Sequence, residues 1–398
     1  MKRKLVIVVS HPIQHFAPFY RALAKEPEID LTVVFCSRIG VKPYFDKAMN
    51  TMISWKMDLL GGYHHIFLPE ADKIIRTSPS SVNNPSVTAE MGRIKPDAVL
   101  IYGYNYITSL RALWWCRRRK VPAMMISDSE LKTVRTGQMN RLKDLALPVI
   151  LRQYNAFLTV GDCNEDYLMH YGVPREKLFR SPFTIDEDLY QKAYKERVML
   201  RERVRGELGI APDEVVALTV GKLSKRKRPS DVVDAARALK AKGLEVRFVL
   251  VGNGEELERL SAIVEREDLP VILAGFINVD VLPGYYAAAD MIVHTSERDP
   301  HPLVTCEGTC IALPLILSDR VGAVGPTDSA RPGENALVFP VGDVSALAER
   351  VAELVHAPNR LLAMSVRSRE IFEELDMRRS VRGICDAMAY CTRERSRL

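Results

Sequence analysis

The sequence lacks any hydrophobic run long enough to cross a membrane. No window approaches the roughly 18–20 uncharged apolar residues that a spanning helix requires, so an integral membrane protein is excluded. The chain begins with Met-Lys-Arg-Lys and the apolar run LVIVVS, which superficially resembles a signal peptide. The run ends at Ser10-His11-Pro12 without a small-residue cleavage site, and we therefore expect a buried first strand.

Cysteine and histidine are sparse and scattered. The seven cysteines are odd in number and form no C-x-x-C pair, and the eight histidines form no cluster with them. This pattern argues against a disulfide framework and against a structural zinc site, and it favours a reducing compartment. We expect a cytoplasmic protein that needs no bound metal and no cofactor.

Several motifs that identify enzyme classes are also missing. The dinucleotide-binding pattern G-x-G-x-x-G is absent, and its nearest match, Gly252-Asn253-Gly254, lacks the third glycine. There is no Walker A motif and no G-x-S-x-G elbow, which disfavours P-loop NTPases and the common hydrolases. No zinc-finger, RNA-recognition or helix-turn-helix signature accompanies the basic charge, so we expect no nucleic-acid partner. The triplet Asp186-Glu187-Asp188 imitates a metal-binding pair, but a turn with helix-capping carboxylates is the better interpretation.

What is present is an alternation of strands and helices along 398 residues with 47% hydrophobic and 27% charged side chains. Short β-branched runs predict strands at 5–9, 31–35, 98–102 and 156–160, and again at 215–220, 246–251, 271–275 and 291–295. Continuous apolar strands separated by amphipathic helices indicate parallel sheets that are covered on both faces. The fold class is therefore α/β.

The strands fall into two groups, which predicts two doubly wound, Rossmann-like domains that face each other across a cleft. We place the first domain at residues 1–190, a charged helical connection at 191–213 and the second domain at 214–372. The remaining helical stretch, 373–398, is expected to cross back to the first domain. In such sheets ligands bind beyond the carboxyl ends of the strands, so a substrate is expected between the domains.

The net charge of +6 is carried by the first half of the chain. Residues 1–190 hold 26 Lys and Arg against 19 Asp and Glu, whereas the remainder holds 30 against 31. The densest cluster, 117–120, directly follows Leu113-Trp114-Trp115 on a helical pattern. It is either a solvated helix end whose cations favour the helix dipole, or an aromatic and basic surface suited to lipid headgroups.

A basic loop follows the first strand of the second domain. The segment GKLSKRKRPSDVV begins at Gly221, carries Lys222 and Lys227, and leads into a helix opened by Pro229 or Ser230. A helix N-terminus already favours anions, and added cations would make a site for a diphosphate. The alternative is an ordinary solvated loop.

A second segment, HTSERDPHPLVTCEGTC, follows the strand at 291–295. Asp299 and Glu307 lie eight residues apart, and Leu303-Val304 lead into a helix that Glu307 is expected to open. Carboxylates at such a loop can accept hydrogen bonds from sugar or ribose hydroxyls. Spaced acids of this kind are also common as purely structural residues.

Together these segments resemble glycosyltransferase family four, the glycosyl transferases group 1. Lys222 and Lys227 match the basic pair of its G-R-L-x-x-x-K-G motif, and Asp299 and Glu307 match its Glu, seven residues, Glu motif. YYAAADMIVHTS, ALPLILSD and PGENALVFPVGDVSALAERV are similar to the same family, and a looser likeness runs through the first half. The resemblance implies a GT-B fold and a retaining, metal-independent transfer of a sugar from a UDP- or GDP-linked donor.

The resemblance also implies roles for individual residues. Lys222 and Lys227 would stabilise the leaving diphosphate, Glu307 would hold the ribose hydroxyls, and Asp299 would contact the sugar. Donor contacts are also expected from Gly221, from the backbone of Leu303 and Val304, and from Gly275 and Phe276 beside the base. In the first domain, Asp128 stands where many members carry a sugar-contacting histidine, and either contacts the sugar or caps a helix. His15 and Tyr104 are candidates for the acceptor site, with a structural loop histidine as the alternative for His15.

The chain departs from the family pattern in ways that affect the donor sugar more than the reaction class. Lys222 replaces Arg, Asp299 replaces a longer Glu, and 300–302 read Pro-His-Pro where many members have Gly-Phe-Gly. The acceptor is expected to be a glycan or a lipid-linked saccharide, with peripheral contact at the inner membrane face. The alternatives are an epimerase or hydrolase of nucleotide-sugars, and an inactive scaffold that binds them.

Overall fold

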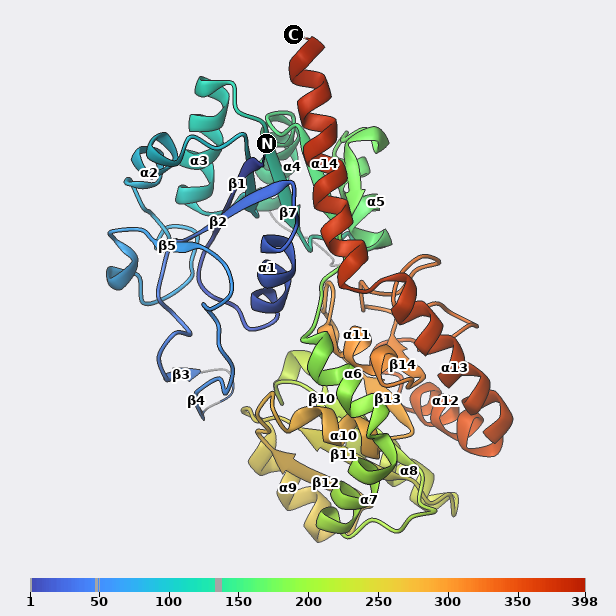
Figure 1. The fold of residues 1–398 in the computed structure, drawn as a ribbon. Coiled ribbons are helices and arrows are strands. Elements are labelled where there is room, and N and C mark those ends of the chain that lie inside the picture. Colours follow the sequence, from blue (N-terminus) through green and yellow to red (C-terminus); the bar gives the residue numbers. More distant parts are fainter. Residues whose placement is uncertain (1, 47–48, 50, 133–137, 398) are drawn as a thin grey trace. The chain divides into compact units, whose positions relative to one another are not determined.

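The computed structural model describes residues 2–46, 49, 51–132 and 138–397. The chain divides into two compact units. Unit 1 comprises Met1–Tyr44, Met57–Ile185 and Asp376–Leu398, and unit 2 comprises Phe45–Lys56 and Asp186–Leu375. Each unit is built on one parallel sheet with helices on both faces, so the predicted α/β class with two doubly wound sheets is confirmed (Figure 1).

The sheet of unit 1 has seven strands in the order β5-β2-β1-β6-β7-β8-β9. All neighbours pair in parallel. The four strands predicted in this half are present. The strands that sequence reasoning missed are β5, β7 and β9, which are short or rich in methionine. In chain order the strands are β1 (Arg3–Val9), β2 (Ile29–Phe35), β5 (His65–Phe67), β6 (Ala98–Tyr102), β7 (Ala123–Ser127), β8 (Ala156–Thr159) and β9 (Leu178–Arg180).

Helices cover both faces of this sheet. On one face a core forms under α2 (Val87–Ile94), α3 (Ile107–Arg119), α4 (Gln138–Leu151) and α5 (Asp162–His170). On the other face the core includes residues of α1 (Phe16–Ala24) and of the long α14 (Met377–Arg397). The helix α14, red in Figure 1, lies against β8, β9 and α1. Residues of α14 from Val381 to Cys391 therefore complete the core of unit 1, although they lie near the end of the sequence.

The sheet of unit 2 has six parallel strands in the order β12-β11-β10-β13-β14-β15. The four strands predicted in this half are present, and β14 and β15 were missed. A separate two-stranded sheet is formed by β3 (Tyr44–Asp46) and β4 (Thr51–Ile53). In chain order the six strands are β10 (Val216–Val220), β11 (Arg247–Val251), β12 (Val271–Gly275), β13 (Met291–His294), β14 (Leu315–Ser318) and β15 (Ala336–Phe339).

Alternation along β13 shows how the two faces of this sheet are covered. Met291 and Val293 face a core that also includes residues of α8 (Pro229–Ala241), α9 (Leu257–Arg266), α12 (Val344–His356) and α13 (Pro358–Glu374). Ile292, between them, lies against Gly308 of α11 (Leu303–Cys310). The helix α10 (Leu282–Ala288) contacts α11, α6 (Glu187–Lys195) and α7 (Arg197–Leu208).

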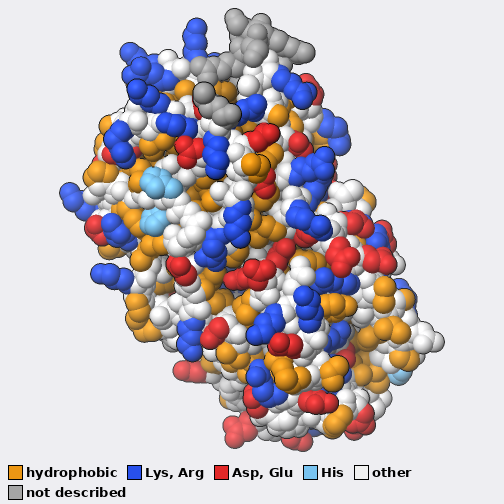
Figure 2. Space-filling model, viewed as in Figure 1, with side chains coloured by type: hydrophobic (Ala, Val, Ile, Leu, Met, Phe, Trp, Pro, Cys, Tyr) orange, Lys and Arg blue, Asp and Glu red, His pale blue; other side chains and the backbone are white. Residues whose placement is uncertain are grey.

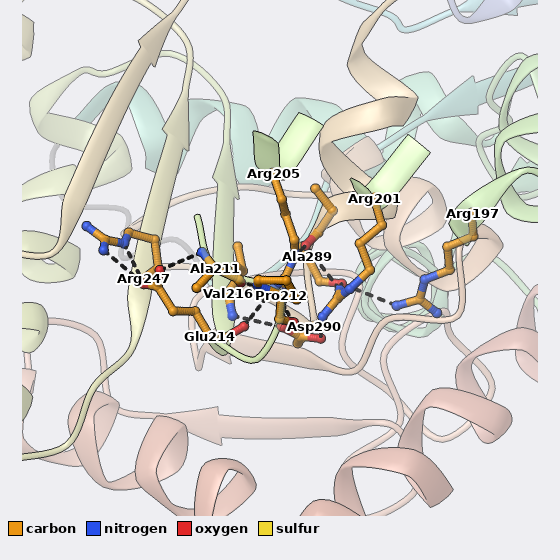
Figure 3. A network of polar contacts seen from close by, with 11 residues as sticks. Arg197, Arg201, Arg205, Ala211, Pro212, Glu214, Val216, Arg247, Ala289 and Asp290 are labelled. Atoms are coloured by element: carbon orange, nitrogen blue, oxygen red, sulfur yellow. Dashed lines mark hydrogen bonds and ion pairs between the residues drawn. The ribbon is translucent and has the colours of Figure 1, made fainter. Parts of the chain in front are cut away.

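Residues 191–213, which the sequence predicted to be a connection between domains, lie within unit 2. A buried arginine on α7 holds this stretch in place (Figure 3). The guanidinium of Arg205, 3% exposed, donates to the backbone oxygens of Ala288, Ala211, Pro212 and Glu214. It also pairs with the carboxylate of Asp290 at 2.8 Å. Asp290 additionally binds Arg201 and the backbone N–H of Val216 at the start of β10. This network fastens α7 to the central strand of unit 2.

Replacing Arg205 with Ala is expected to destabilise the protein by about 3–5 kcal/mol, because buried carbonyls and one carboxylate lose their donor. Urea unfolding monitored by circular dichroism measures this loss. The matched control is Arg203→Ala on the same helix, where the side chain is 54% exposed and pairs only loosely with Glu207. The control should change stability by less than about 0.5 kcal/mol. Equal effects of the two substitutions would contradict the role assigned to Arg205.

Candidate functional site

The candidate site of unit 2 lies at the point where the order of its strands reverses. The neighbouring strands β10 and β13 are parallel, so their carboxyl ends lie at the same edge of the sheet. The loop after β10 carries Lys222 and Lys227, and the loop after β13 carries Asp299. In open α/β sheets this switch point is where ligands bind. Residues separated by more than 70 positions in the sequence are thus brought together.

The glycines beside this loop allow backbone segments to approach closely. A Cβ on Gly252 would lie 1.8 Å from the oxygen of Gly221, and a Cβ on Gly254 would lie 2.5 Å from the oxygen of Leu223. The backbone N–H of Leu223 donates to Asn253 at 2.9 Å. The backbone of Gly252-Asn253-Gly254 therefore packs directly against the basic loop. This close contact explains why glycine is needed at 252 and 254 without a dinucleotide-binding motif.

The loops after β10 and β13 are joined by hydrogen bonds. The hydroxyl of Thr295 donates to the backbone oxygens of Lys227 at 2.8 Å and Arg228 at 2.9 Å. The backbone N–H of Glu297 donates to Arg226 at 3.0 Å. Arg228 adopts a left-handed conformation with φ 53°, and α8 begins immediately after it at Pro229, as predicted. The backbone of Lys227 is consequently held beside the loop after β13, which carries Asp299.

Asp299 is the centre of a buried group of charges. Its Oδ2 accepts a hydrogen bond from Nε2 of His294 at 2.8 Å and forms an ion pair with the ammonium of Lys227. Burial by itself would raise the pKa of Asp299, but His294 and Lys227 hold that pKa well below its usual range. Burial lowers the pKa of Lys227, against the opposing effect of Asp299, and burial also lowers the pKa of His294. Asp299 is therefore ionised and His294 neutral at physiological pH.

Lys222 makes a different ion pair. Its ammonium lies 2.8 Å from the carboxylate of Asp46, which belongs to the short strand β3. The Lys222 side chain is 40% exposed, so this pair contributes little to stability. Sequence reasoning gave Asp46 no role, because nothing in its surroundings identifies a partner 176 residues away.

Glu307 lies one helical turn inside α11 and does not open that helix, so this detail of the prediction was wrong. Pro302 occupies the N-cap and the helix begins at Leu303. The carboxylate of Glu307 accepts a hydrogen bond from the hydroxyl of Tyr286, and Tyr190 is a second side-chain partner. Burial raises the pKa of Glu307. Both tyrosines are buried, and their rings lie 5.6 Å apart.

The N-terminus of α11 supplies backbone donors at the same edge of the sheet. Pro302 has no N–H, and the amides of Leu303 and Val304 occupy the first turn, where helical amides have no acceptor within the helix. This end of the helix carries a partial positive charge. It lies at the end of the same loop as Asp299, so an anion there would meet backbone amides as well as lysine.

Gly275 and Phe276 lie at the carboxyl end of the neighbouring strand β12. Gly275 has φ 69°, a conformation that favours glycine, and its oxygen accepts from the backbone N–H of Gly252 at 2.8 Å. The ring of Phe276 meets Trp55 edge-on at 6.5 Å. The side-chain amide of Asn278 donates to the oxygen of Ser54 at 2.7 Å, so Ser54 and Trp55 are held beside Phe276.

The other three candidates lie in unit 1, at the carboxyl ends of adjacent strands. His15 follows β1 and is the N-cap of α1, Tyr104 follows β6, and Asp128 follows β7. Among the described residues neither ring nitrogen of His15 has a hydrogen-bond partner, and burial lowers the pKa of His15 to about 3. The Tyr104 hydroxyl shares a hydrogen bond of 2.9 Å with Tyr167. Asp128 is exposed.

Unit 2 thus brings together Lys222, Lys227, Asp299, Leu303, Val304 and Glu307 around two adjacent loops. Sequence reasoning missed the side chains that hold them, namely His294, Tyr286, Tyr190 and Asp46. Both His294 and Tyr286 stand inside the segments that carried the resemblance. Only His294, at the end of β13, had an available signal, namely a polar residue at a strand end; Tyr286 lies within α10. Among the residues that the structure describes, no group of three or more His, Cys, Asp or Glu side chains is arranged to hold a metal ion.

Comparison with known proteins identifies the family of this half of the chain. Residues 201–371 match the family model of the glycosyl transferases group 1. The chain carries a glycosyl transferases group 1 domain. Its curated relatives include a GDP-mannose-dependent alpha-mannosyltransferase of Mycobacterium tuberculosis, 33% identical over 37% of this chain and 36% of the relative. Another is a D-inositol 3-phosphate glycosyltransferase of Rhodococcus erythropolis, 27% identical over 47% and 44%.

The chain spans between about a third and a half of the length of these curated relatives. Solved structures match the group 1 domain together with the rest of the chain. The Anabaena protein Alr3699/HepE, in complex with UDP and glucose, has a TM-score of 0.70 at 15% identity, covering 97% of this chain and 99% of that one. A glycosyltransferase from Rickettsia africae has a TM-score of 0.74 at 13% identity, covering 98% and 99%. These likenesses confirm the predicted GT-B fold.

The two acids of the group 1 motif are expected to affect stability in opposite directions. Asp299 has a lowered pKa in the folded state, so its ionised form stabilises the fold above the unfolded pKa near 4, and this contribution is lost as the pH falls. Glu307 has a raised pKa, so its ionisation destabilises the fold as the pH rises through that value. Each pKa unit is worth about 1.4 kcal/mol.

We therefore expect Asp299→Asn to lower the melting temperature at pH 8 and Glu307→Gln to raise it. The difference for Glu307→Gln should shrink toward pH 4, where Glu307 approaches protonation in both the folded and the unfolded state, whereas the difference for Asp299→Asn should persist down to pH 4 and shrink only below it. Scanning calorimetry of the three proteins between pH 4 and pH 8 measures these differences. A Glu307→Gln protein less stable than wild type at pH 8 would contradict the raised pKa.

Proposed function

We propose that this protein is a retaining, metal-independent glycosyltransferase that moves a sugar from a nucleoside diphosphate to a glycan or a lipid-linked saccharide. The observation that carries the proposal is the pairing of Lys227 with buried Asp299, beside Lys222 and the N-terminus of α11. This arrangement would supply cations for a diphosphate and a carboxylate for a sugar at one edge of the sheet. The group 1 domain and the names of its relatives support the same reaction class.

The chemistry requires positive charge where the leaving group forms. Breaking the bond between the anomeric carbon and oxygen builds negative charge on the β-phosphate, and cations fixed in place beforehand stabilise it. Lys222, Lys227 and the amides of Leu303 and Val304 would supply that charge without a metal ion. In a retaining transfer the acceptor attacks from the face that the leaving group departs, and the departing phosphate takes the proton from the acceptor hydroxyl.

The remaining residues would orient the donor. Glu307, held by two buried tyrosines, would accept hydrogen bonds from the ribose hydroxyls, and Asp299 would contact the sugar. The base would lie near Gly275 and Phe276. A UDP- or GDP-linked donor is supported by two relatives: the Anabaena structure contains UDP, and the mycobacterial relative is named as GDP-mannose-dependent.

The acceptor site is proposed for the carboxyl edge of the unit 1 sheet. Between β1 and β6 the order of strands reverses, so His15, Tyr104 and Asp128 surround the switch point of this sheet. The buried ring nitrogens of neutral His15 can donate one hydrogen bond and accept another from sugar hydroxyls.

The first prediction of this proposal concerns the two lysines. Wild-type protein should be stabilised against heat by UDP or GDP, because a ligand that binds the folded state raises the melting temperature. It should also release that nucleoside diphosphate from the matching nucleotide-sugar faster when a saccharide acceptor is present. Lys222→Ala/Lys227→Ala should abolish the thermal shift and lower turnover at least about a hundredfold.

Lys225→Ala is the matched control, since Lys225 is exposed on the same loop. It should keep turnover within about threefold of wild type, and addition of EDTA should leave turnover unchanged. Equal release with and without acceptor would favour a hydrolase, and a thermal shift without any turnover would favour an inactive scaffold. Loss of activity in EDTA with recovery in Mn²⁺ would contradict a metal-independent reaction.

We also propose that the outer surface of α3 and α4 contacts an anionic membrane. Trp114 is 58% exposed on α3, Leu145 is 76% exposed on α4, and both helices cover the same face of the sheet. Arg118 lies over the ring of Trp114 at 5.4 Å, next to the basic residues 117–120. Figure 2 shows Lys and Arg side chains gathered over the part of unit 1 that carries α2 and α3. Within the described residues no helix is sufficiently long and apolar to span a bilayer.

Exposed aromatic and basic side chains together suit a headgroup layer, and each basic residue near such a surface contributes about 1 kcal/mol. Trp114→Ser/Arg118→Ser should therefore weaken cosedimentation with vesicles of phosphatidylglycerol and phosphatidylcholine about tenfold. Leu362→Ser, which removes an exposed leucine from α13, is the control and should bind like wild type. Equal binding of wild type to vesicles of pure phosphatidylcholine would contradict an electrostatic contact.

A further inference from the structure

The backbone at Asp299 is held in place by neighbouring backbone, so the reach of the carboxylate depends on the length of the Asp299 side chain. The N–H of Gly322 donates to the oxygen of Asp299 at 2.9 Å. A Cβ on Gly322 would lie 2.0 Å from the oxygen of Pro300, so these two backbone segments are in close contact. The backbone cannot shift to compensate for a side chain one methylene shorter than the Glu of the family motif.

His294 lies where its side chain can compensate for the shorter side chain of Asp299. It is the last residue of β13 and only 3% exposed, and its Nε2 lies 2.8 Å from Oδ2 of Asp299. A carboxylate accepts hydrogen bonds, so Nε2 carries the proton of the neutral ring. Lys227 binds the same oxygen. Among the described residues no hydrogen bond to the other oxygen, Oδ1, accompanies these two contacts.

We infer that His294 is a positioning residue that takes the place of the missing methylene. Its Nε2–H fixes Oδ2 against Lys227, so that Oδ1 faces outward to the donor sugar. The side chains at 294 and 299 are therefore matched in size: a Glu at 299 would push its carboxylate into the imidazole. This inference rests on the proposed transferase reaction and assigns His294 no contact with the reacting atoms.

The test is a cycle of His294→Leu, Asp299→Glu and the double variant. His294→Leu should lower kcat about tenfold to a hundredfold, the effect of losing one hydrogen bond to a charged group, with KM for the donor within about threefold. Asp299→Glu alone should also lower kcat. The double variant should recover to within about threefold of wild type, since leucine reaches less far than imidazole and leaves room for the longer acid.

His356→Leu, the same change at the end of α12, is the control and should keep wild-type kinetics. If His294 served packing alone, a different result would follow. The kcat of His294→Leu would then equal that of wild type, or the lowered kcat would not be restored by adding Asp299→Glu. Either outcome overturns the inference, provided that the melting temperatures show folded variants.

Nuclear magnetic resonance supplies a readout that does not depend on activity. The ring ¹⁵N shifts of His294 should report the neutral Nε2–H tautomer in wild type and should change in Asp299→Asn. An Nδ1–H tautomer would overturn the inference even in an active enzyme. If wild type shows neither turnover nor a nucleotide-dependent thermal shift, the proposed function fails, and the tautomer still decides whether His294 positions Asp299.

Discussion

Parallel pairing of strands is the constraint on which the rest of this structure depends. Because β10 and β13 run in the same direction, the chain must cross over between them, and both of their exit loops lie at one edge. The same holds for β1, β6 and β7 in unit 1. The candidate residues of this protein lie at or beyond the carboxyl ends of parallel strands, with Gly275 and Phe276 at the end of β12. The sheets thus decide where chemistry can occur before any side chain is considered.

Burial of charge is the second constraint, and the site of unit 2 meets it in two ways. Asp299 is kept ionised by a cation and a histidine that bind one of its oxygens. Burial raises the pKa of Glu307, so its ionisation is disfavoured even though Tyr286 and Tyr190 donate hydrogen bonds to its carboxylate. A carboxylate held at a cost to stability is characteristic of functional sites, where selection acts on activity. Arg205, by contrast, is buried among carbonyl oxygens and serves the fold.

Much of the fold was predictable because buried parallel strands carry a strong local signal. All eight predicted strands are present, and each is a continuous run of mainly β-branched or other apolar residues. Strands such as β7, with the sequence AMMIS, and β9, with LFR, lack that signal and form because neighbouring strands pair with them. The predicted start of α11 was wrong because the helix begins directly after Pro302, one turn before the acid at 307.

The sequence by itself determined the fold class, since buried apolar strands alternating with helices can be recognised locally, and residue types at fixed spacing made Lys222, Lys227, Asp299 and Glu307 the candidates for the site. The tertiary structure alone decided which side chains hold them. His294, Tyr190 and Asp46 come from the end of β13, from α6 and from the short strand β3, and no spacing rule connects them to their partners. The physical reason is that hydrogen bonds and ion pairs depend on distance in space, and the crossovers of a parallel sheet bring together residues far apart in the chain.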